Sequence, residues 1–243
     1  MIFRYGMFMK RKLISVFTLI LLFFGDMGFG ECADYEKGLA AARQGDFETA
    51  LREWGPLAEQ GEARSQFAIG VMYENGDGVP QSYDIALQWY KLAADQGKDY
   101  AQYNLGVIYE RGQGVPQDFK NAINWYTLSA EQGHAQAQYN LGVMYVKGQG
   151  APQDLNTAFK FFKLAAEQGN SDAQYNLGWM YGSGQGVVKD NVRAHMWFSF
   201  AALSGGEDAT INKEKIAKRM NPSQIKEASE LAKECYQKKF KDC

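Results

Sequence analysis

QYNLGVIY at 102–109 is one of four related octapeptides in this chain; the others are QFAIGVMY at 66–73, QYNLGVMY at 138–145 and QYNLGWMY at 174–181. Successive copies begin 36 residues apart, without insertion or deletion. A fixed period of roughly 20 to 50 residues indicates a stacked array, in which each unit buries its apolar face against its neighbours. Such an array presents an extended surface instead of one enclosed pocket, so the pattern favours binding over catalysis.

The octapeptide belongs to the first of two helices predicted in each unit. Leu105, Ile108 and Tyr109 follow the i, i+3, i+4 spacing of one apolar helical stripe. A glycine recurs within this helix, where it costs about 1 kcal/mol relative to alanine. We therefore expect a partner helix to approach so closely that a Cβ would block it. The recurring glycines are Gly70, Gly106, Gly142 and Gly178.

A glycine-rich loop separates the two helices: GDGVPQ at 76–81, GQGVPQ at 112–117, GQGAPQ at 148–153 and GQGVVK at 184–189. Its glycines permit a left-handed backbone, and proline cannot continue the first helix. The loops lack the lysine-serine pair and the preceding strand of a phosphate-binding loop, so nucleotide binding is not expected.

The second helix has start and stop signals in the same register. Its predicted N-caps are Ser82, Asp118, Asp154 and Asp190, and its predicted left-handed C-terminal glycines are Gly97, Gly133, Gly169 and Gly205. Between them, small alanines alternate with large aromatic residues, which suits helices packed at close range. Each unit is therefore a helix–turn–helix.

These patterns predict seven parts of the chain. The parts are a signal peptide at 1–33, a degenerate repeat that caps the N-terminus at 34–61, repeats at 62–97, 98–133, 134–169 and 170–205, and C-terminal capping helices at 206–243. After Gly206 the period is no longer visible, and Ser223 is the predicted N-cap of the last helix.

The N-terminus carries an export signal. Four basic residues precede an apolar run at 13–24, which is too short to span a bilayer and typical of a signal peptide. We predict export to the periplasm or the extracellular space, with no membrane segment after cleavage. Cleavage after Gly30 or after Ala33, a start at Met7 or Met9, and an uncleaved anchor all stay open.

The cysteines and histidines give one further prediction. In an oxidising compartment Cys235 and Cys243 are expected to form a disulfide, the alternative being two reduced, exposed thiols. The histidines, His134 and His195, lie near no cysteine in the sequence, so no metal or other cofactor is predicted. A net charge of −2 shows no nucleic-acid footprint.

Three motifs resemble the Sel-1-like repeat family, a relative of tetratricopeptide repeats. They are A-x-x-Q-Y-N-L-G-x-M-Y at 135–145, G-x-G-V-P-Q-D at 112–118 and W-Y-x-x-A-A-x-Q-G at 89–97. The last repeat departs from the pattern, with Val188 and Lys189 in place of Pro-Gln. Over about 34–234 the resemblance implies an all-α fold, a right-handed α/α superhelix (tetratricopeptide-like solenoid) with terminal caps. It also implies adaptor roles in secretion, the cell envelope, signalling or host interaction.

By analogy with that fold, the first helices line a concave face and project three rows of side chains from it. The aromatic row is Phe67, Tyr103, Tyr139 and Tyr175; the asparagine row is Ala68, Asn104, Asn140 and Asn176; the third row is Val71, Val107, Val143 and Trp179. Aromatic rings and amides suit an extended peptide. The alternative is that the asparagines bond the neighbouring repeat and the tyrosines belong to the core between repeats.

The predicted function is a non-catalytic, monomeric adaptor scaffold of the cell envelope or secreted space that holds a protein or peptide partner on this face. The alternative is a β-lactam-binding or cell-wall-acting hydrolase of the cysteine-rich Sel-1-like type. It depends on one S-x-x-K match, Ser223 to Lys226, without the companion S-D-N and K-T-G elements. The internal cysteines of that type are also missing. The capped ends argue against a third alternative, an end-to-end assembling module.

Overall fold

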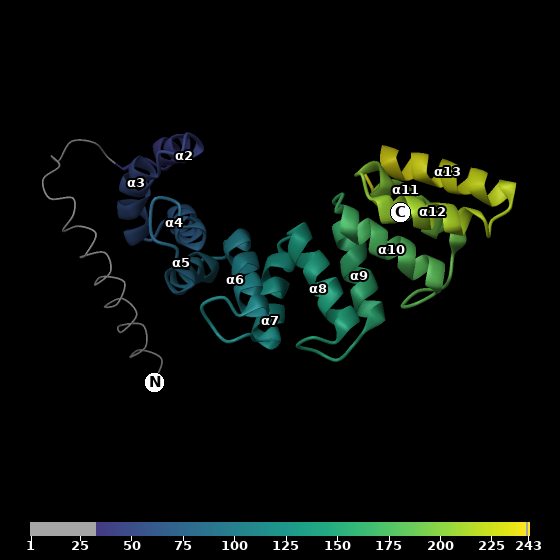
Figure 1. The fold of residues 1–243 in the computed structure, drawn as a ribbon, viewed down its shortest axis with the longest axis horizontal. Helices are drawn as coiled ribbons and strands as arrows, with labels where there is room; N and C mark the ends of the chain where they lie inside the picture. The colour runs from purple at the N-terminus through teal and green to yellow at the C-terminus, as the bar shows by residue number, and fades with distance from the viewer. Residues whose placement is uncertain (1–32, 242) are drawn as a thin grey trace, which may run out of the picture. The chain divides into compact units, whose positions relative to one another are not determined.

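The computed structural model describes residues 33–241 and 243, and this part of the chain contains helices and turns but no strand (Figure 1). The predicted signal sequence through residue 32, including the cut after Gly30, lies outside the described residues. The helices are α2 Tyr35–Arg43, α3 Phe47–Glu59, α4 Ala63–Asn75, α5 Tyr83–Asp95, α6 Asp99–Arg111, α7 Phe119–Glu131, α8 Ala135–Lys147, α9 Leu155–Ala166, α10 Ser171–Ser183, α11 Asn191–Leu203, α12 Glu207–Ala217 and α13 Pro222–Gln237.

Helices pack in chain order, as expected for a repeat array (Figure 1). The first helix of a repeat packs on the second helix of the same repeat, and that helix packs on the first helix of the next repeat. The 36-residue period therefore becomes a linear succession of equivalent contacts.

The predicted caps of the second helices are confirmed. Ser82 accepts a hydrogen bond from the backbone N–H of Ile85 at 3.3 Å, and Asp118 accepts one from Asn121 at 3.0 Å. Asp154 and Asp190 cap α9 and α11 in the same way. The glycines that follow these helices have positive φ, for example +84° at Gly97, a conformation that glycine adopts without steric cost.

Close approach of the paired helices, expected from the mid-helix glycines, is also confirmed. A Cβ built on Gly70 of α4 would lie 2.6 Å from the ring of Tyr90 on α5. The degenerate first unit makes the same contact, because a Cβ on Gly38 of α2 would lie 2.5 Å from Nε1 of Trp54 on α3. In both pairs an aromatic ring occupies the space that a side chain would need.

Beyond Gly206, where the 36-residue period is expected to fail, three positions of α12 still stand in register with α10. Ala209, Asn212 and Ile216 stand 36 residues after Ala173, Asn176 and Met180. Ala209 and Ile216 are buried, as are Ala173 and Met180. Only positions in contact with neighbouring helices keep the repeat pattern. Lysines between these positions depart from it, so the pattern is hard to see in the sequence.

The N-cap of α13 is Asn221, so the prediction of Ser223 is wrong. Asn221 Oδ1 accepts the backbone N–H of Gln224 at 2.9 Å, and Gln224 Oε1 accepts the backbone N–H of Asn221 at 3.0 Å. This reciprocal pair is a capping box. Pro222 then fills the first helical position, where its missing N–H has no consequence. Helix α13 packs on α11.

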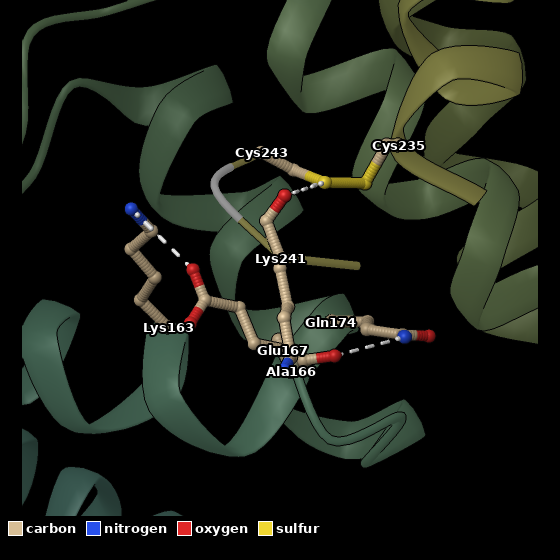
Figure 2. Close-up of a disulfide and its surroundings, with 7 residues drawn as sticks. All are labelled: Lys163, Ala166, Glu167, Gln174, Cys235, Lys241 and Cys243. Carbon is tan, nitrogen blue, oxygen red and sulfur yellow. Dashed lines mark hydrogen bonds and ion pairs between the residues drawn. A yellow bond between two sulfur atoms is a disulfide. The ribbon is translucent and has the colours of Figure 1, made fainter. Parts of the chain in front are cut away.

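The structure contains the Cys235–Cys243 disulfide, which ties the end of the chain to α13 (Figure 2). Cys235 is buried in a cluster that includes Trp197 and Phe200 of α11. Between the cysteines, the ring of Phe240 meets Phe200 edge-on, with ring centroids 5.0 Å apart. The disulfide thus closes a short loop that contains Phe240 and its contact with Phe200.

Candidate functional site

The candidate site lies on the first helices of the repeats, α4, α6, α8 and α10. All members of the aromatic row are half-buried, and so are Asn104, Asn140, Asn176, Val107 and Val143. Trp179 differs from all of these, since 42% of its surface is exposed. The rows therefore combine a partly covered surface with one prominent side chain.

The aromatic row packs against the second helix of its own repeat. The ring centroids of Tyr103 and Tyr126 are 5.8 Å apart, and those of Tyr139 and Phe162 are 5.9 Å apart. Burial raises the pKa of Tyr103 and of Tyr139. These tyrosines are therefore part of the helix-pair packing and present only part of each ring to a partner.

The asparagine row reaches back to tyrosine hydroxyls of the preceding repeat. Asn212 Nδ2, the next member of this row by register, donates to Tyr175 Oη at 3.0 Å. Burial raises the pKa of Tyr90, the Glu74 carboxylate raises it further, and a hydrogen bond with Asn104 opposes the rise. The amides thus join successive repeats, while their use by a ligand stays a proposal.

Two acidic residues near the ends of the first helices are also engaged. In the repeat at 98–133, Tyr126 Oη donates to Glu110 Oε2 at 2.6 Å. In the repeat at 62–97, Tyr90 Oη donates to Glu74 Oε2. Each bond joins the two helices of one repeat. These carboxylates therefore help to hold the two helices of a repeat together, in addition to contributing negative charge.

Trp179 borders a groove of about 190 Å³ between α10, α11 and α12. Phe198 of α11 and Ile216 of α12 add apolar surface to it. Asn212 and Lys215 of α12 and Arg219, just after that helix, add polar groups. By register, Lys215 is the residue that follows Val143 and Trp179 in the third row. Here an exposed aromatic ring of a first helix lies beside polar and basic side chains.

A larger hollow of about 490 Å³ lies at the start of α10 and α12. Asp172, Glu207 and Asp208 give it an acidic lining, and Tyr175 and Ser204 contribute to it. Ser204, which lines the hollow, stands 36 residues after Gln168, so the hollow has a shorter side chain at that position of the repeat.

The residues that sequence analysis missed fall into two groups. The groove residues Asn212, Lys215 and Arg219 were missed because the period was thought to end at Gly206, although counting 36 residues from Asn176 and Trp179 finds the first two. The second group is a ladder of buried glutamines at the first letter of the octapeptide. Its members are Gln66, Gln102, Gln138 and Gln174.

The glutamine ladder joins one repeat to the next. Gln138 Nε2 donates to the carbonyl oxygen of Ala130 in the preceding second helix at 3.1 Å. Gln138 Oε1 accepts from Gln168 Nε2 at 2.7 Å. Figure 2 shows the equivalent bond from Gln174 to Ala166 beside the disulfide. A recurring polar residue next to an apolar stripe was the available sequence signal.

The S-x-x-K match lies on the first turns of α13. Ser223 and Lys226 are both exposed, and Lys226 Nζ lies 3.7 Å from Glu230 Oε1. Neither Ser223 nor Lys226 lines either of the two hollows described above.

Within the range that the structure describes, no cluster of three or more His, Cys, Asp or Glu side chains is arranged to hold a metal ion. No helix in the same range is both long and apolar enough to cross a membrane.

Comparison with known proteins identifies the repeat. The Sel1 repeat matches at residues 63–98, 99–134, 135–170 and 171–206, which together cover more than half of the 243 residues. The chain belongs to the Sel1 repeat family. Proteins built from Sel1 repeats generally serve as scaffolds for protein interactions. The predicted all-α repeat fold is confirmed by the helices and by this match.

Two solved structures are similar to this Sel1 repeat protein. A Sel1 repeat protein from Oxalobacter formigenes is 29% identical, with a TM-score of 0.70, over 81% of this chain and 85% of its own. A protective antigen of uropathogenic Escherichia coli strains, which displays an SLR fold, is 38% identical over 69% of this chain, with a TM-score of 0.68. The similarity spans only 36% of that antigen's length. No curated protein matches the chain.

Proposed function

We propose that this Sel1 repeat protein is a non-catalytic adaptor of the cell envelope or secreted space, which holds a protein or peptide partner along the faces of α4, α6, α8 and α10. The observation that carries the proposal is the exposure of Trp179. Its ring is 42% exposed on a helix whose other large apolar residues are mostly buried. Tryptophan is enriched among the residues that dominate binding energy at protein interfaces.

The three rows contribute unequally to this surface. Asn104 and Asn140 lie beside tyrosine hydroxyls of the preceding repeat and oppose the rise in the pKa of those tyrosines, so their amides have less capacity for a peptide backbone. Val107 and Val143 are half-buried and uncharged, and they extend the apolar surface from Trp179 along the array. We therefore place the main contact on the third row, with the tyrosine edges beside it.

Site-specific photo-cross-linking tests this placement. A benzoylphenylalanine residue is introduced singly at Val107, Val143 or Trp179 in the full chain, and the cells are irradiated. Leu128 and Leu164 are matched controls, because they lie on second helices and are 44% and 46% exposed. We expect the third-row variants to share one cross-linked partner that the two controls do not capture.

Two outcomes contradict the scaffold proposal. One is cross-linking from Leu128 and Leu164 but not from the third row. The other is no cross-link from the third row while circular dichroism shows folded variants. Export is tested separately by N-terminal sequencing of the mature protein, and retention of residues 1–22 argues against cleavage of the predicted signal peptide.

A further inference from the structure

Two basic side chains without acidic partners border the Trp179 groove. Lys215 and Arg219 are exposed, and in the described residues neither lies within ion-pair distance of a carboxylate. The only polar partner of Lys215 Nζ there is Asn212 Oδ1, at 3.5 Å. By contrast, the exposed Arg193 pairs with Asp190 at 2.8 Å. The groove therefore has two cations available to an acidic ligand.

The groove also has an apolar side next to these cations. Trp179, Phe198 and Ile216 line it, and a volume of about 190 Å³ is enough for a side chain but small for a folded domain. An apolar surface beside a pair of cations is complementary to a segment that carries apolar and acidic side chains together.

The two cations favour acidic side chains over a single chain terminus. Lys215 lies in the last turn of α12, and Arg219 lies two residues after the helix ends at Ala217. Both line the groove, so two acidic side chains of one segment would each meet a cation, whereas one terminal carboxylate would bring a single negative charge.

Basic residues at the end of a helix have a simpler explanation, since they interact favourably with the helix dipole. Lys218, which is exposed at the same end of α12, has that role without lining the groove. The dipole does not account for a tryptophan exposed beside Lys215 and Arg219. The combination of groove, ring and unpaired charges is what indicates a ligand.

We propose that the groove binds an acidic segment of the partner, with an apolar side chain on Trp179 and two carboxylates at Lys215 and Arg219. This inference rests on the scaffold function proposed above, and it names the chemistry of the partner at one end of the surface.

The test is a fluorescence-anisotropy titration of the full chain with short labelled peptides, blocked at both ends, that carry two Glu residues and one Phe. The same peptide with Gln in place of Glu is the charge control, and the Gln peptide with a free carboxyl end tests a chain terminus. We expect binding of the Glu peptide that weakens with added salt. Lys215→Glu and Arg219→Glu should each lower its affinity at least about tenfold.

Lys218→Glu is the matched protein control, since it changes the net charge equally at the same helix end and should leave the affinity within about twofold. Trp179→Ala should lower the affinity about tenfold for the Glu peptide. Lys215→Gln and a thermal melt of each variant guard against misfolding, and the Gln variant should also bind more weakly than the parent.

Four results overturn the inference: no binding of the Glu peptide, equal binding of the blocked Gln peptide, equal binding of the Gln peptide with the free carboxyl end, or equal losses from Lys218→Glu and Lys215→Glu. If the third row cross-links to a partner and the titration fails, the scaffold stands and only the acidic segment is wrong. If the third row does not cross-link, the scaffold itself fails, whatever the titration shows.

Discussion

The ring of Phe162 on α9 lies against the backbone of Gly142 on α8, and a Cβ built on Gly142 would be 2.5 Å from Phe162 Cε1. That distance is shorter than any carbon–carbon contact at van der Waals separation. Equivalent contacts join Gly70 to Tyr90 and Gly178 to Phe198. The glycine at the centre of the octapeptide is therefore the point where each helix pair makes its closest contact.

Gly142→Ala should destabilise the protein. Alanine favours the helix by about 1 kcal/mol, but its methyl group must displace the buried Phe162 ring, and overpacking of this kind costs about 1 to 3 kcal/mol. We expect a net loss in the free energy of unfolding, measured by urea denaturation. Gly182→Ala is the control, because its Cβ would meet the flexible end of Ile216 at 3.1 Å. A Gly142→Ala variant more stable than the parent would contradict the packing argument.

Gln138 should couple energetically to Gln168. Gln138→Leu removes two side-chain hydrogen bonds at a position that is 4% exposed, and we expect a loss of about 1 to 2 kcal/mol in unfolding free energy. Gln168→Leu, at an exposed position, should cost less. The double variant should show a coupling energy of about 0.5 to 1 kcal/mol. Strict additivity of the two single changes would contradict the predicted coupling between Gln138 and Gln168.

The aspartate caps should make stability fall in acid. A hydrogen bond from the backbone of Asn121 lowers the pKa of Asp118, and one from the Thr157 hydroxyl lowers the pKa of Asp154, both below 3.8. Because the folded-state pKa is depressed, this contribution is complete above pH 3.8 and is lost as the pH falls through the lowered pKa.

Asp118→Asn with Asp154→Asn should therefore flatten the dependence of the urea midpoint on pH below pH 3.8, while changing it little at pH 7. Asparagine caps a helix as well as aspartate but does not titrate. An acid dependence as steep as that of the parent would show that the caps are not its source.

Loss of the disulfide should loosen the end of the chain. Closing a loop between residues eight apart contributes about 2.5 kcal/mol in the chain-entropy description. Cys243→Ser should lower the thermal midpoint and expose Phe240 and the buried end of α13 to amide hydrogen exchange. Reductant should lower the midpoint of the parent to that of the variant and leave the variant unchanged. A parent that does not respond to reductant would contradict this role.

The sequence predicted the repeats because each of their signals is local or strictly periodic. Ser82 and Asp118 cap helices through backbone groups within a few residues, and Gly106 recurs at a position that a Cβ would block. Beyond Gly206 only Ala209, Asn212 and Ile216 retain the register, too few positions for the sequence to show a further repeat. The prediction was wrong at Ser223 because Asn221 and Gln224 together outcompete a serine cap.

The sequence placed the candidate residues on helices but could not give their contacts. Register alone placed Tyr139, Asn140 and Val143 on one helix. It could not show that Asn140 lies beside Tyr126 of the preceding repeat and opposes the rise in the pKa of that tyrosine, or that Phe162 packs against Tyr139. Those contacts join residues of different helices, and their geometry depends on how closely the helices approach.

The sequence by itself determined the repeat, because a helix–turn–helix that recurs every 36 residues can bury its apolar face only against another copy. The tertiary structure decided which side chains that packing buries or engages in hydrogen bonds. It buried the glutamine ladder, joined the Asn212 amide to Tyr175 and left Trp179 exposed beside Lys215 and Arg219. Exposure is a property of neighbours in space, and only the packing of α10, α11 and α12 brings these residues to one groove.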